Sequence, residues 1–197
     1  MNIGIFGGTF DPVHTGHLIV AQDAWSALGL DRVLFIPAAV PPHKRGRVAA
    51  SPELRLEMLR AATAGDPRFA TSDLELRRSG PSYTVDTLRE LRERDPSGAL
   101  FLLLGADQFR EFHTWREPGE ITRLATLVVL SRGGTEAPPP PLDLPYRRLT
   151  VTRVDISATE IRRRVAAGQP VRYLVPAAVE EIIRREGLYR AGARSAP

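Results

Sequence analysis

The sequence predicts an α/β fold, in which a doubly wound parallel sheet carries helices on both of its faces. Short, almost wholly apolar segments, typical of buried parallel strands, alternate along the 197-residue chain with segments whose apolar residues recur at helical spacing. Strands that alternate with helices pair in parallel through right-handed crossovers. The Gly-rich and polar motifs follow expected strands directly, and such sheets bind ligands outside the carboxyl ends of their strands. We therefore expect a Rossmann-like sheet with one ligand cleft at that edge.

The first half of the chain is expected to begin with a buried strand at residues 2–6 and a helix over 18–28. Ser51, Pro52 and Glu53 indicate a second helix start, because they suit the N-cap, the first helical position and the first turn. Ser82 or Thr84 is expected to cap the third helix. The other boundaries expected in this half are a strand at 32–37, a loop at 38–50, a helix end near 64, a strand at 69–76 and a helix end near 94.

The second half continues the same alternation and ends in a polar tail. The expected elements are a turn at 95–98, strands at 99–104, 126–130 and 149–154, and helices at 118–124, 157–167 and 176–186. Four consecutive prolines predict a surface loop over 133–145. We expect one domain over residues 1–190, followed by a disordered tail at 191–197.

The composition is that of an ordinary globular protein, with 43% apolar and 25% charged residues. No run of 18 apolar residues occurs, and the N-terminus leads directly into a strand, so neither a membrane span nor a leader peptide is expected. Zero cysteines exclude disulfides, cysteine–zinc sites and thiol catalysis. These features favour a cytoplasmic enzyme without a membrane partner, and they leave the oligomeric state open, with a homo-oligomer as one option.

The net charge of +4 and the sequence pI of about 10.1 fit either nucleic acid or polyphosphate ligands. The basic residues are dispersed, and they form no stripe with interleaved aromatic residues. The sequence therefore favours phosphate-rich small molecules and no nucleic acid.

The stretch from Gly7 to His17 reads Gly-Gly-Thr-Phe-Asp-Pro-Val-His-Thr-Gly-His and joins the first strand to the first helix. Such a turn directs main-chain N–H groups and the positive end of a helix dipole into a cleft, where they suit an anion. Gly7 and Gly8 are expected to supply unusual backbone angles and a close approach for a phosphate. His14 and His17 share one face of a helix start and can stabilise a phosphoryl oxygen in a transition state, while Gly16 leaves the approach open. Their spacing and the absence of cysteine disfavour zinc.

A second anion site is expected where Ser157 and Glu160 form a capping box. Taken alone, this pattern is a well-made helix start. The hydroxyls of Ser157 and Thr159 and the guanidinium of Arg162 also suit a polyphosphate. Lys44 is the one lysine among 27 basic residues, and its compact ammonium suits a phosphate contact that a planar Arg could not make.

The string from Gly7 to His17 resembles the signature of the nucleotidyltransferase superfamily with the T/HxGH motif. Its longer form, with two leading glycines and Thr-Phe-Asp-Pro before His-x-Gly-His, is most similar to the bacterial nicotinate-nucleotide adenylyltransferases. The resemblance covers roughly the first 190 residues. It implies that ATP and nicotinate mononucleotide are substrates, that deamido-NAD and pyrophosphate are products, and that Mg²⁺ acts through the ATP phosphates without a protein metal site.

The resemblance also implies roles for individual residues. It implies ATP binding by Gly7, Gly8, Thr9, Phe10, His17, Asp107, Ser157, Thr159 and Arg162. It implies catalysis by His14, His17, Lys44 and Arg162, and binding of the acceptor nucleotide by Lys44, Thr84, Trp115 and Arg116.

Several of these roles have a structural alternative. Asp107 could bind the ribose diol or simply cap the next turn, and Trp115 could stack on the pyridine ring or belong to the core. Ala158 replaces the second serine of the related motif, which removes one hydroxyl contact. Arg116 stands where relatives often have an aromatic residue, and it either pairs with the nicotinate carboxylate or is exposed.

Other functions are weaker matches to the motifs. Phosphopantetheine adenylyltransferase and nicotinamide-mononucleotide adenylyltransferase are the nearest alternatives, and the double glycine and Trp115 argue against the first. A non-catalytic nucleotide-binding regulator would not need both histidines and Arg162. A dehydrogenase is disfavoured because the first turn lacks Gly-x-Gly-x-x-Gly.

Overall fold

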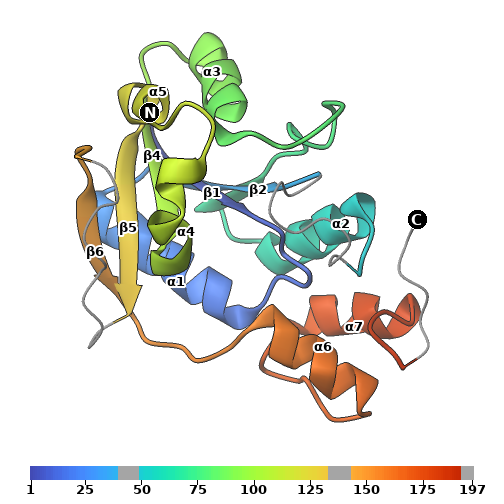
Figure 1. Ribbon diagram of the computed structural model, residues 1–197. Coiled ribbons are helices and arrows are strands. Elements are labelled where there is room, and N and C mark those ends of the chain that lie inside the picture. Colours follow the sequence, from blue (N-terminus) through green and yellow to red (C-terminus); the bar gives the residue numbers. More distant parts are fainter. Residues whose placement is uncertain (40–48, 133–142, 192–197) are drawn as a thin grey trace.

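The computed structural model describes residues 1–39, 49–132 and 143–191 (Figure 1). Within these ranges the chain forms one parallel sheet with helices packed on both faces. Four predictions lie wholly or largely outside the described residues: Lys44, most of the loop at 38–50, most of the proline-rich loop at 133–145, and all but the first residue of the tail at 191–197.

The sheet has six strands in the order β3-β2-β1-β4-β5-β6, and every neighbouring pair is parallel. The strands are β1 (Asn2–Gly8), β2 (Arg32–Pro37), β3 (Phe69–Thr71), β4 (Ala99–Gly105), β5 (Thr126–Arg132) and β6 (Arg147–Val151). The order reverses between β1 and β4, where the chain crosses from one half of the sheet to the other. In such sheets the crevice at the switch point is the usual place for a ligand. The predicted doubly wound α/β fold is therefore confirmed.

Two hydrophobic cores lie on opposite faces of the sheet, because successive strand side chains alternate between the faces. In β4, Phe101 and Leu103 belong to one core, and Leu100, Leu102 and Leu104 belong to the other. The first core is covered by α1 (Thr15–Leu28), α2 (Pro52–Thr63), α6 (Ala158–Ala166) and α7 (Ala177–Arg185). The second is covered by α3 (Thr84–Arg94), α4 (Ala106–Arg110), the 3₁₀ helix η1 (Phe112–Thr114) and α5 (Pro118–Leu124). Figure 1 shows α6 and α7 together at the lower right, beyond the end of the sheet.

The second helix begins as predicted. The hydroxyl of Ser51 accepts a hydrogen bond from the Leu54 main-chain N–H at 3.3 Å, and Pro52 occupies the first helical position. Glu53 lies in the first turn, where its charge is favourable with respect to the helix dipole.

The third strand is shorter than the predicted 69–76, because it ends at Thr71. Ser72 donates its main-chain N–H to the carbonyl of Phe35, and the chain then turns away from the sheet. The Leu76 and Arg77 main-chain N–H groups both bond the carbonyl of Asp73, which closes a helical turn where a strand was expected. The apolar residues of this segment therefore reach the core from a turn.

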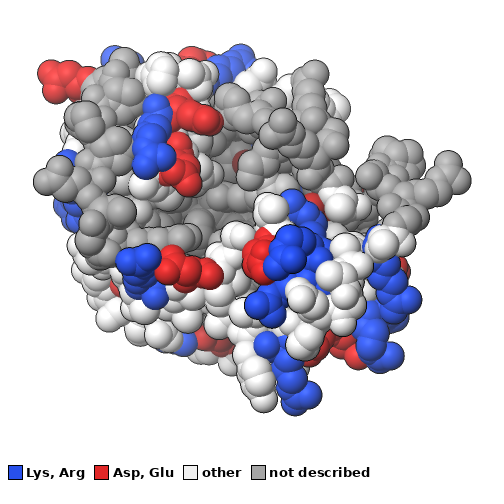
Figure 2. All heavy atoms as spheres, turned by 60° about the horizontal axis from the view of Figure 1, so that its bottom comes forward, with Lys and Arg blue, Asp and Glu red and all other residues white. Residues whose placement is uncertain are grey.

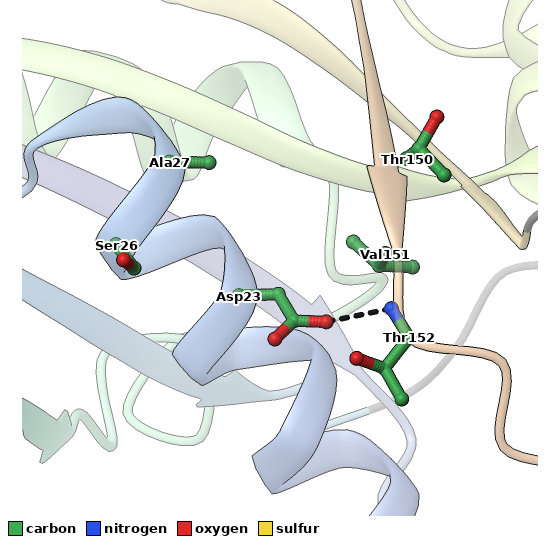
Figure 3. Close-up of a pocket in the computed structure, with 6 residues that line it drawn as sticks. All are labelled: Asp23, Ser26, Ala27, Thr150, Val151 and Thr152. Atoms are coloured by element: carbon green, nitrogen blue, oxygen red, sulfur yellow. Dashed lines mark hydrogen bonds between the residues drawn. The ribbon is translucent and has the colours of Figure 1, made fainter.

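The last strand lies two to three residues earlier than the predicted 149–154. Its end is fixed by α1, because the Asp23 carboxylate accepts a hydrogen bond from the Thr152 main-chain N–H at 2.6 Å (Figure 3). The Thr152 N–H group therefore bonds a side chain of α1 at the point where pairing with β5 ends. The surface hollow beside this contact measures about 480 Å³.

The start of α3 also differs from the prediction that Ser82 or Thr84 caps it. Tyr83 is at the N-cap and its side chain makes no cap hydrogen bond. The Ser82 hydroxyl instead accepts a hydrogen bond from the Ala39 main-chain N–H at 2.9 Å. Thr84 is the first residue inside the helix, so the main-chain N–H groups of this terminus remain near the carboxyl edge of the sheet.

Candidate active site

A cavity of about 1200 Å³ lies at the carboxyl ends of the central strands. Both predicted phosphate motifs line it, although they are about 140 residues apart in sequence. The predicted site residues that line it are Gly7, Gly8, Thr9, Phe10, His14, His17, Thr84, Asp107, Trp115, Arg116, Ser157, Thr159 and Arg162. The sequence motifs therefore converge on a single cavity.

The two glycines of the first motif do not take the unusual backbone angles that the sequence suggested. Gly7 and Gly8 continue β1 and pair with Ile36 and Pro37 of β2, and the left-handed residue of the turn is Phe10, with φ of 49°. A Cβ atom at Gly8 would lie 3.0 Å from the Phe10 ring, whereas a Cβ at Gly7 would meet no atom within 4 Å. Gly8 therefore makes room for Phe10, and Gly7 leaves open space at the cavity wall.

His14 and His17 mark the start of α1, which begins three residues earlier than predicted. His14 is the N-cap residue, and its main-chain N–H donates to Nδ1 of His17 at 3.1 Å. The two rings stack with their centroids 3.6 Å apart. Because a main-chain N–H can only donate, Nδ1 of His17 carries no proton in this arrangement, and the proton of the neutral ring is on Nε2. The edge of the ring that carries Nε2–H is the donor that His17 can offer a phosphoryl oxygen.

Gly16 lines the cavity and also makes room for a histidine ring. A Cβ atom there would lie 3.1 Å from Nδ1 and 3.2 Å from Cε1 of His14, which is 7% exposed. The absence of a side chain at Gly16 therefore serves the packing of His14, and an open ligand approach at this position stays a prediction. The His17 ring also packs against a phenylalanine, because the Phe10 ring meets it edge-on with the centroids 5.0 Å apart.

The second motif forms the start of α6. The hydroxyl of Ser157 accepts a hydrogen bond from the Glu160 main-chain N–H at 3.1 Å, so the cap is present. The side chain of Glu160 instead bonds to Arg163 and Arg164, which hold its pKa at about 2. The expected reciprocal half of the capping box is therefore replaced by ion pairs on the outer face of the helix.

Arg162 links the two motifs directly. Its Nη1 donates to the main-chain carbonyl of Asp11 at 2.7 Å, and its Nη2 donates to the hydroxyl of Thr159 at 3.3 Å. The Arg162 side chain is 28% exposed, so it is partly shielded from water while it lines the cavity. A guanidinium in this position places positive charge between the histidine pair and the capped helix start.

Behind this contact lie three buried residues that the sequence analysis did not single out: Asp11, Arg55 and Tyr189. Asp11 and Tyr189 are joined by a 2.8 Å hydrogen bond from the tyrosine hydroxyl to Oδ1. The signal available in the sequence was weak, because an Arg in a helix is mostly exposed and a Tyr is as compatible with the surface as with the core. Only their burial distinguishes them.

Asp107 follows β4, as predicted, but as part of the short helix α4, which the sequence analysis did not foresee. Its carboxylate is 92% exposed and pairs with Arg110 at 2.6 Å. The side chain stands at the cavity rim and not inside the protein, so it is accessible to a ligand hydroxyl group.

Thr84, Trp115 and Arg116 line the other end of the cavity. Trp115 is partly buried, and its ring lies 5.4 Å from that of Phe112, so it combines core packing with an exposed face. Arg116 is half exposed, lies over the Tyr83 ring and pairs with Asp86 at 3.5 Å. The Arg116 guanidinium therefore forms ion pairs with acidic side chains at the rim of the cavity.

Glu75 is a further buried carboxyl group at this end that the sequence analysis missed. It is 8% exposed, accepts a 2.7 Å hydrogen bond from the Thr87 hydroxyl and lines the cavity. Burial raises its pKa, and the hydrogen bonds from Thr87 and Ser82 and the charge of Arg78 partly oppose this rise. It was overlooked because the segment was expected to be a strand.

Among the described residues, no group of three or more His, Asp and Glu side chains could hold a metal ion. No helix in the same residues is long and apolar enough to cross a membrane.

Three comparisons relate the chain to known proteins. A model of the Cytidylyltransferase-like family matches residues 5–164. A Thermus thermophilus protein named "Probable nicotinate-nucleotide adenylyltransferase" is 53% identical over 194 residues, which cover 96% of this chain and 100% of the relative. A protein with the same name from Thermomicrobium roseum is 46% identical and covers 95% and 91% of the two chains.

Solved structures agree on the fold. The chain is similar to Plasmodium falciparum nicotinic acid mononucleotide adenylyltransferase complexed with NaAD, with a TM-score of 0.76 and 18% identity over 95% of this chain and 97% of the other. The same enzyme complexed with APC gives a TM-score of 0.74 at 17% identity, over 95% and 96% of the two chains.

Proposed function

This chain belongs to the nicotinate-nucleotide adenylyltransferases, and we propose that the cavity described above is where it transfers the adenylyl group of ATP to nicotinate mononucleotide. The products are deamido-NAD and pyrophosphate, which makes the reaction a step of NAD synthesis. The observation that carries the proposal is the convergence of both phosphate motifs on one cavity, joined by the hydrogen bond from Arg162 to the Asp11 carbonyl.

The acceptor phosphate attacks the α-phosphorus of ATP in line, and pyrophosphate leaves from the opposite side. A phosphate monoester is already an anion at neutral pH, so the reaction needs no general base. Catalysis then consists of positioning and charge stabilisation. His14 and His17 act on the oxygens of the transferred α-phosphoryl group, and the Nε2–H of His17 is aimed by the bond that fixes Nδ1.

The outgoing pyrophosphate is held by the start of α6. Ser157 and Thr159 supply hydroxyl groups, the first turn supplies main-chain N–H groups, and Arg162 supplies a guanidinium. Lys44 is proposed as a further phosphate contact, and it lies outside the described residues.

The adenosine end and the acceptor end are assigned to different walls of the cavity. Gly7, Gly8, Thr9 and Phe10 border the nucleotide, and Asp107 accepts hydrogen bonds from a ribose. The face of Trp115 stacks on the pyridine ring, and the N–H groups at the start of α3, beside Thr84, bind its carboxylate. Arg116, paired with Asp86 and Glu117, contributes at the rim.

Mg²⁺ is proposed as the cofactor, held by phosphate oxygens and water. This fits the donor set, because both carboxylate oxygens of Asp11 in the cavity wall already accept hydrogen bonds from protein groups. When bound, the ion neutralises charge on the triphosphate.

Three broader predictions accompany the proposal. We propose that residues 1–190 act as one domain and that the enzyme works in the cytoplasm, where ATP is abundant. A homo-oligomer is one possible assembly, and light scattering measures the oligomeric state.

The proposal is tested by measuring pyrophosphate release from ATP with nicotinate mononucleotide, its nicotinamide analogue and phosphopantetheine in parallel. We expect release with the first acceptor and much slower release with the other two. Preference for either alternative acceptor would reassign the substrate. Nucleotide binding without release with any acceptor would favour a regulator instead.

A further inference from the structure

A buried polar cluster behind the cavity consists of Asp11, Arg55 and Tyr189, which are 2%, 1% and 7% exposed. Arg55 and Tyr189 do not line the cavity, so neither touches a ligand there. Burial of charged groups is costly unless their polar atoms are bonded. The bonds that these three residues make therefore indicate what the cluster does.

Arg55, on α2, bonds main-chain carbonyls from three separate segments. Its Nη1 donates to Thr9 at 2.8 Å and to Ala38 at 2.7 Å, its Nη2 to Ala39 at 3.3 Å, and its Nε to Ala50 at 3.3 Å. Burial lowers the pKa of Arg55, and the Asp11 carboxylate is the main charge that opposes this lowering. The guanidinium thus ties the signature turn to the end of β2 and to the segment before α2.

Asp11 makes the complementary set of bonds. Its Oδ2 accepts from the Ala49 main-chain N–H at 2.8 Å, and its Oδ1 accepts from the Ala50 main-chain N–H at 3.1 Å and from the Tyr189 hydroxyl at 2.8 Å. Its main-chain carbonyl accepts the 2.7 Å bond from Arg162. Asp11 is therefore the residue at which the signature turn, α6 and the C-terminal segment meet.

Tyr189 reaches Asp11 from a left-handed backbone conformation, with φ of 63°, in the segment that follows the end of α7 at Arg185. Burial raises the pKa of its hydroxyl, and the Asp11 carboxylate raises it further, so the hydroxyl remains a donor over the working pH range. Its ring belongs to the first hydrophobic core together with Ile161, the residue beside Arg162. The packing of the Tyr189 ring and the hydrogen bond of its hydroxyl therefore both hold the C-terminal segment against Asp11 and α6.

We propose that Tyr189 is a positioning residue for adenylyl transfer: through Asp11 it fixes the signature turn against Arg162, and so sets the place of the guanidinium that holds pyrophosphate. This inference rests on the proposed function and extends it to a residue outside the cavity. Arg55 anchors the same turn from the α2 side. The expected consequence is that the Tyr189 hydroxyl affects pyrophosphate and ATP more than it affects the acceptor.

The informative variant is Tyr189→Phe, which removes one hydroxyl and keeps the buried ring. Asp11→Asn is less useful, because the new amide would meet the N–H and O–H donors that now converge on the carboxylate, and the fold itself would suffer. Tyr146→Phe is the matched control, since Tyr146 packs against Phe109 in the second core and does not line the cavity.

Inhibition by inorganic pyrophosphate, KM for ATP and KM for nicotinate mononucleotide are measured for the purified full-length variants. For Tyr189→Phe we expect about tenfold weaker pyrophosphate inhibition and a similar rise in KM for ATP, with little change in KM for the acceptor. Tyr146→Phe should match the wild type. Equal pyrophosphate inhibition in Tyr189→Phe and wild type, with only a lower melting temperature, would overturn the inference.

A double-mutant cycle tests whether the effect passes through Arg162. Calorimetry of ATP binding should show that Tyr189→Phe weakens binding in the wild-type background but has no further effect in the Arg162→Ala background. Additive losses would contradict the proposal. Failure of the proposed function itself is recognised separately, because wild-type enzyme would then release no pyrophosphate with nicotinate mononucleotide.

Discussion

The Nδ1 atom of His17 accepts the main-chain N–H of His14, and this one bond decides which ring nitrogen carries the proton. Replacing His17 by Ala removes a preorganised donor from the proposed α-phosphoryl site. We expect turnover to fall at least about a hundredfold while the fold persists. His113→Ala is the control, because His113 is exposed on η1 and does not line the cavity. Steady-state pyrophosphate release and circular dichroism check both, and near-normal turnover by His17→Ala would remove it from the mechanism.

Gly7 and Gly119 form a matched pair, since an added Cβ would meet no atom within 4 Å at either position and neither glycine has positive φ. Gly7 lines the cavity, whereas Gly119, in α5, is not among the residues that line it. Gly7→Ala should therefore fold normally and bind ATP at least several-fold more weakly, and Gly119→Ala should leave binding unchanged. Equal ATP affinities in calorimetry would contradict a close phosphate or nucleotide approach at Gly7.

Glu75 makes stability depend on pH. Its raised pKa means that the folded protein keeps a proton that the unfolded chain releases near the ordinary value of 4.5. The resulting loss of stability is absent below that value, grows as pH rises through the folded pKa, and is complete above it. Glu75→Gln should therefore gain stability relative to wild type as pH rises from about the ordinary carboxyl value.

Denaturant unfolding between about pH 4 and pH 8 measures this difference. Glu93→Gln, on the exposed side of α3, is the control and should run parallel to wild type. A pH-independent offset for Glu75→Gln would mean that burial does not govern this carboxyl group.

At the scale of the helices, two serine caps share one hydrogen-bond pattern and have different surroundings. Ser51 caps α2 and Ser157 caps α6, each accepting from the main-chain N–H three residues later. Only Ser157 lines the cavity. Either serine changed to Ala should destabilise the protein by about 1 kcal/mol. Ser157→Ala alone should also raise KM for ATP, and equal kinetics for the two variants would assign Ser157 a purely structural role.

Element boundaries could be predicted where the sequence carries a local signal. The Ser51-Pro52 start and the apolar strand in 99–104 are determined by residues next to one another, and both were placed within one residue. The end of β3 and the end of β6 depend on partners elsewhere, the Phe35 carbonyl and the Asp23 carboxylate. Local pattern contains no information about those partners, so these two strands were misplaced.

At the scale of the whole molecule, many of the basic side chains in the described residues form ion pairs with acidic neighbours. On α6 and α7, Arg163 and Arg164 pair with Glu160, and Arg184 pairs with Glu181. Figure 2 shows blue side chains at the lower right with a few red ones among them. Paired charges give little of the continuous field that nucleic acid binding requires.

A short DNA duplex at about 0.15 M salt should therefore neither bind nor inhibit the enzyme, whereas inorganic triphosphate should compete with ATP. Fluorescence anisotropy of a labelled duplex and the pyrophosphate assay decide between these outcomes. Inhibition by the duplex comparable to that by triphosphate would contradict the prediction.

The sequence by itself determined the alternation of strands and helices, apart from the short helices α4 and η1, and the residue types that meet at the candidate site. Alternating strand-like and helix-like segments favour a parallel sheet covered by helices. The string from Gly7 to His17 is one continuous stretch of sequence, and so is the Ser157 cap, so the residues within each motif are neighbours in any fold. The thirteen described residues predicted for the site all line one cavity, because they lie at the carboxyl ends of the parallel strands or in the segments that follow those ends.

Only the tertiary structure decided how the motifs are held. Asp11, Arg55, Glu75 and Tyr189 are polar residues whose meaning depends on burial, and burial depends on contacts between segments up to 178 positions apart. Folding brings the Tyr189 hydroxyl to the Asp11 carboxylate and the Arg162 guanidinium to the Asp11 carbonyl. A hydrogen bond between distant residues leaves no periodic trace in the sequence, because either partner alone is compatible with an exposed position.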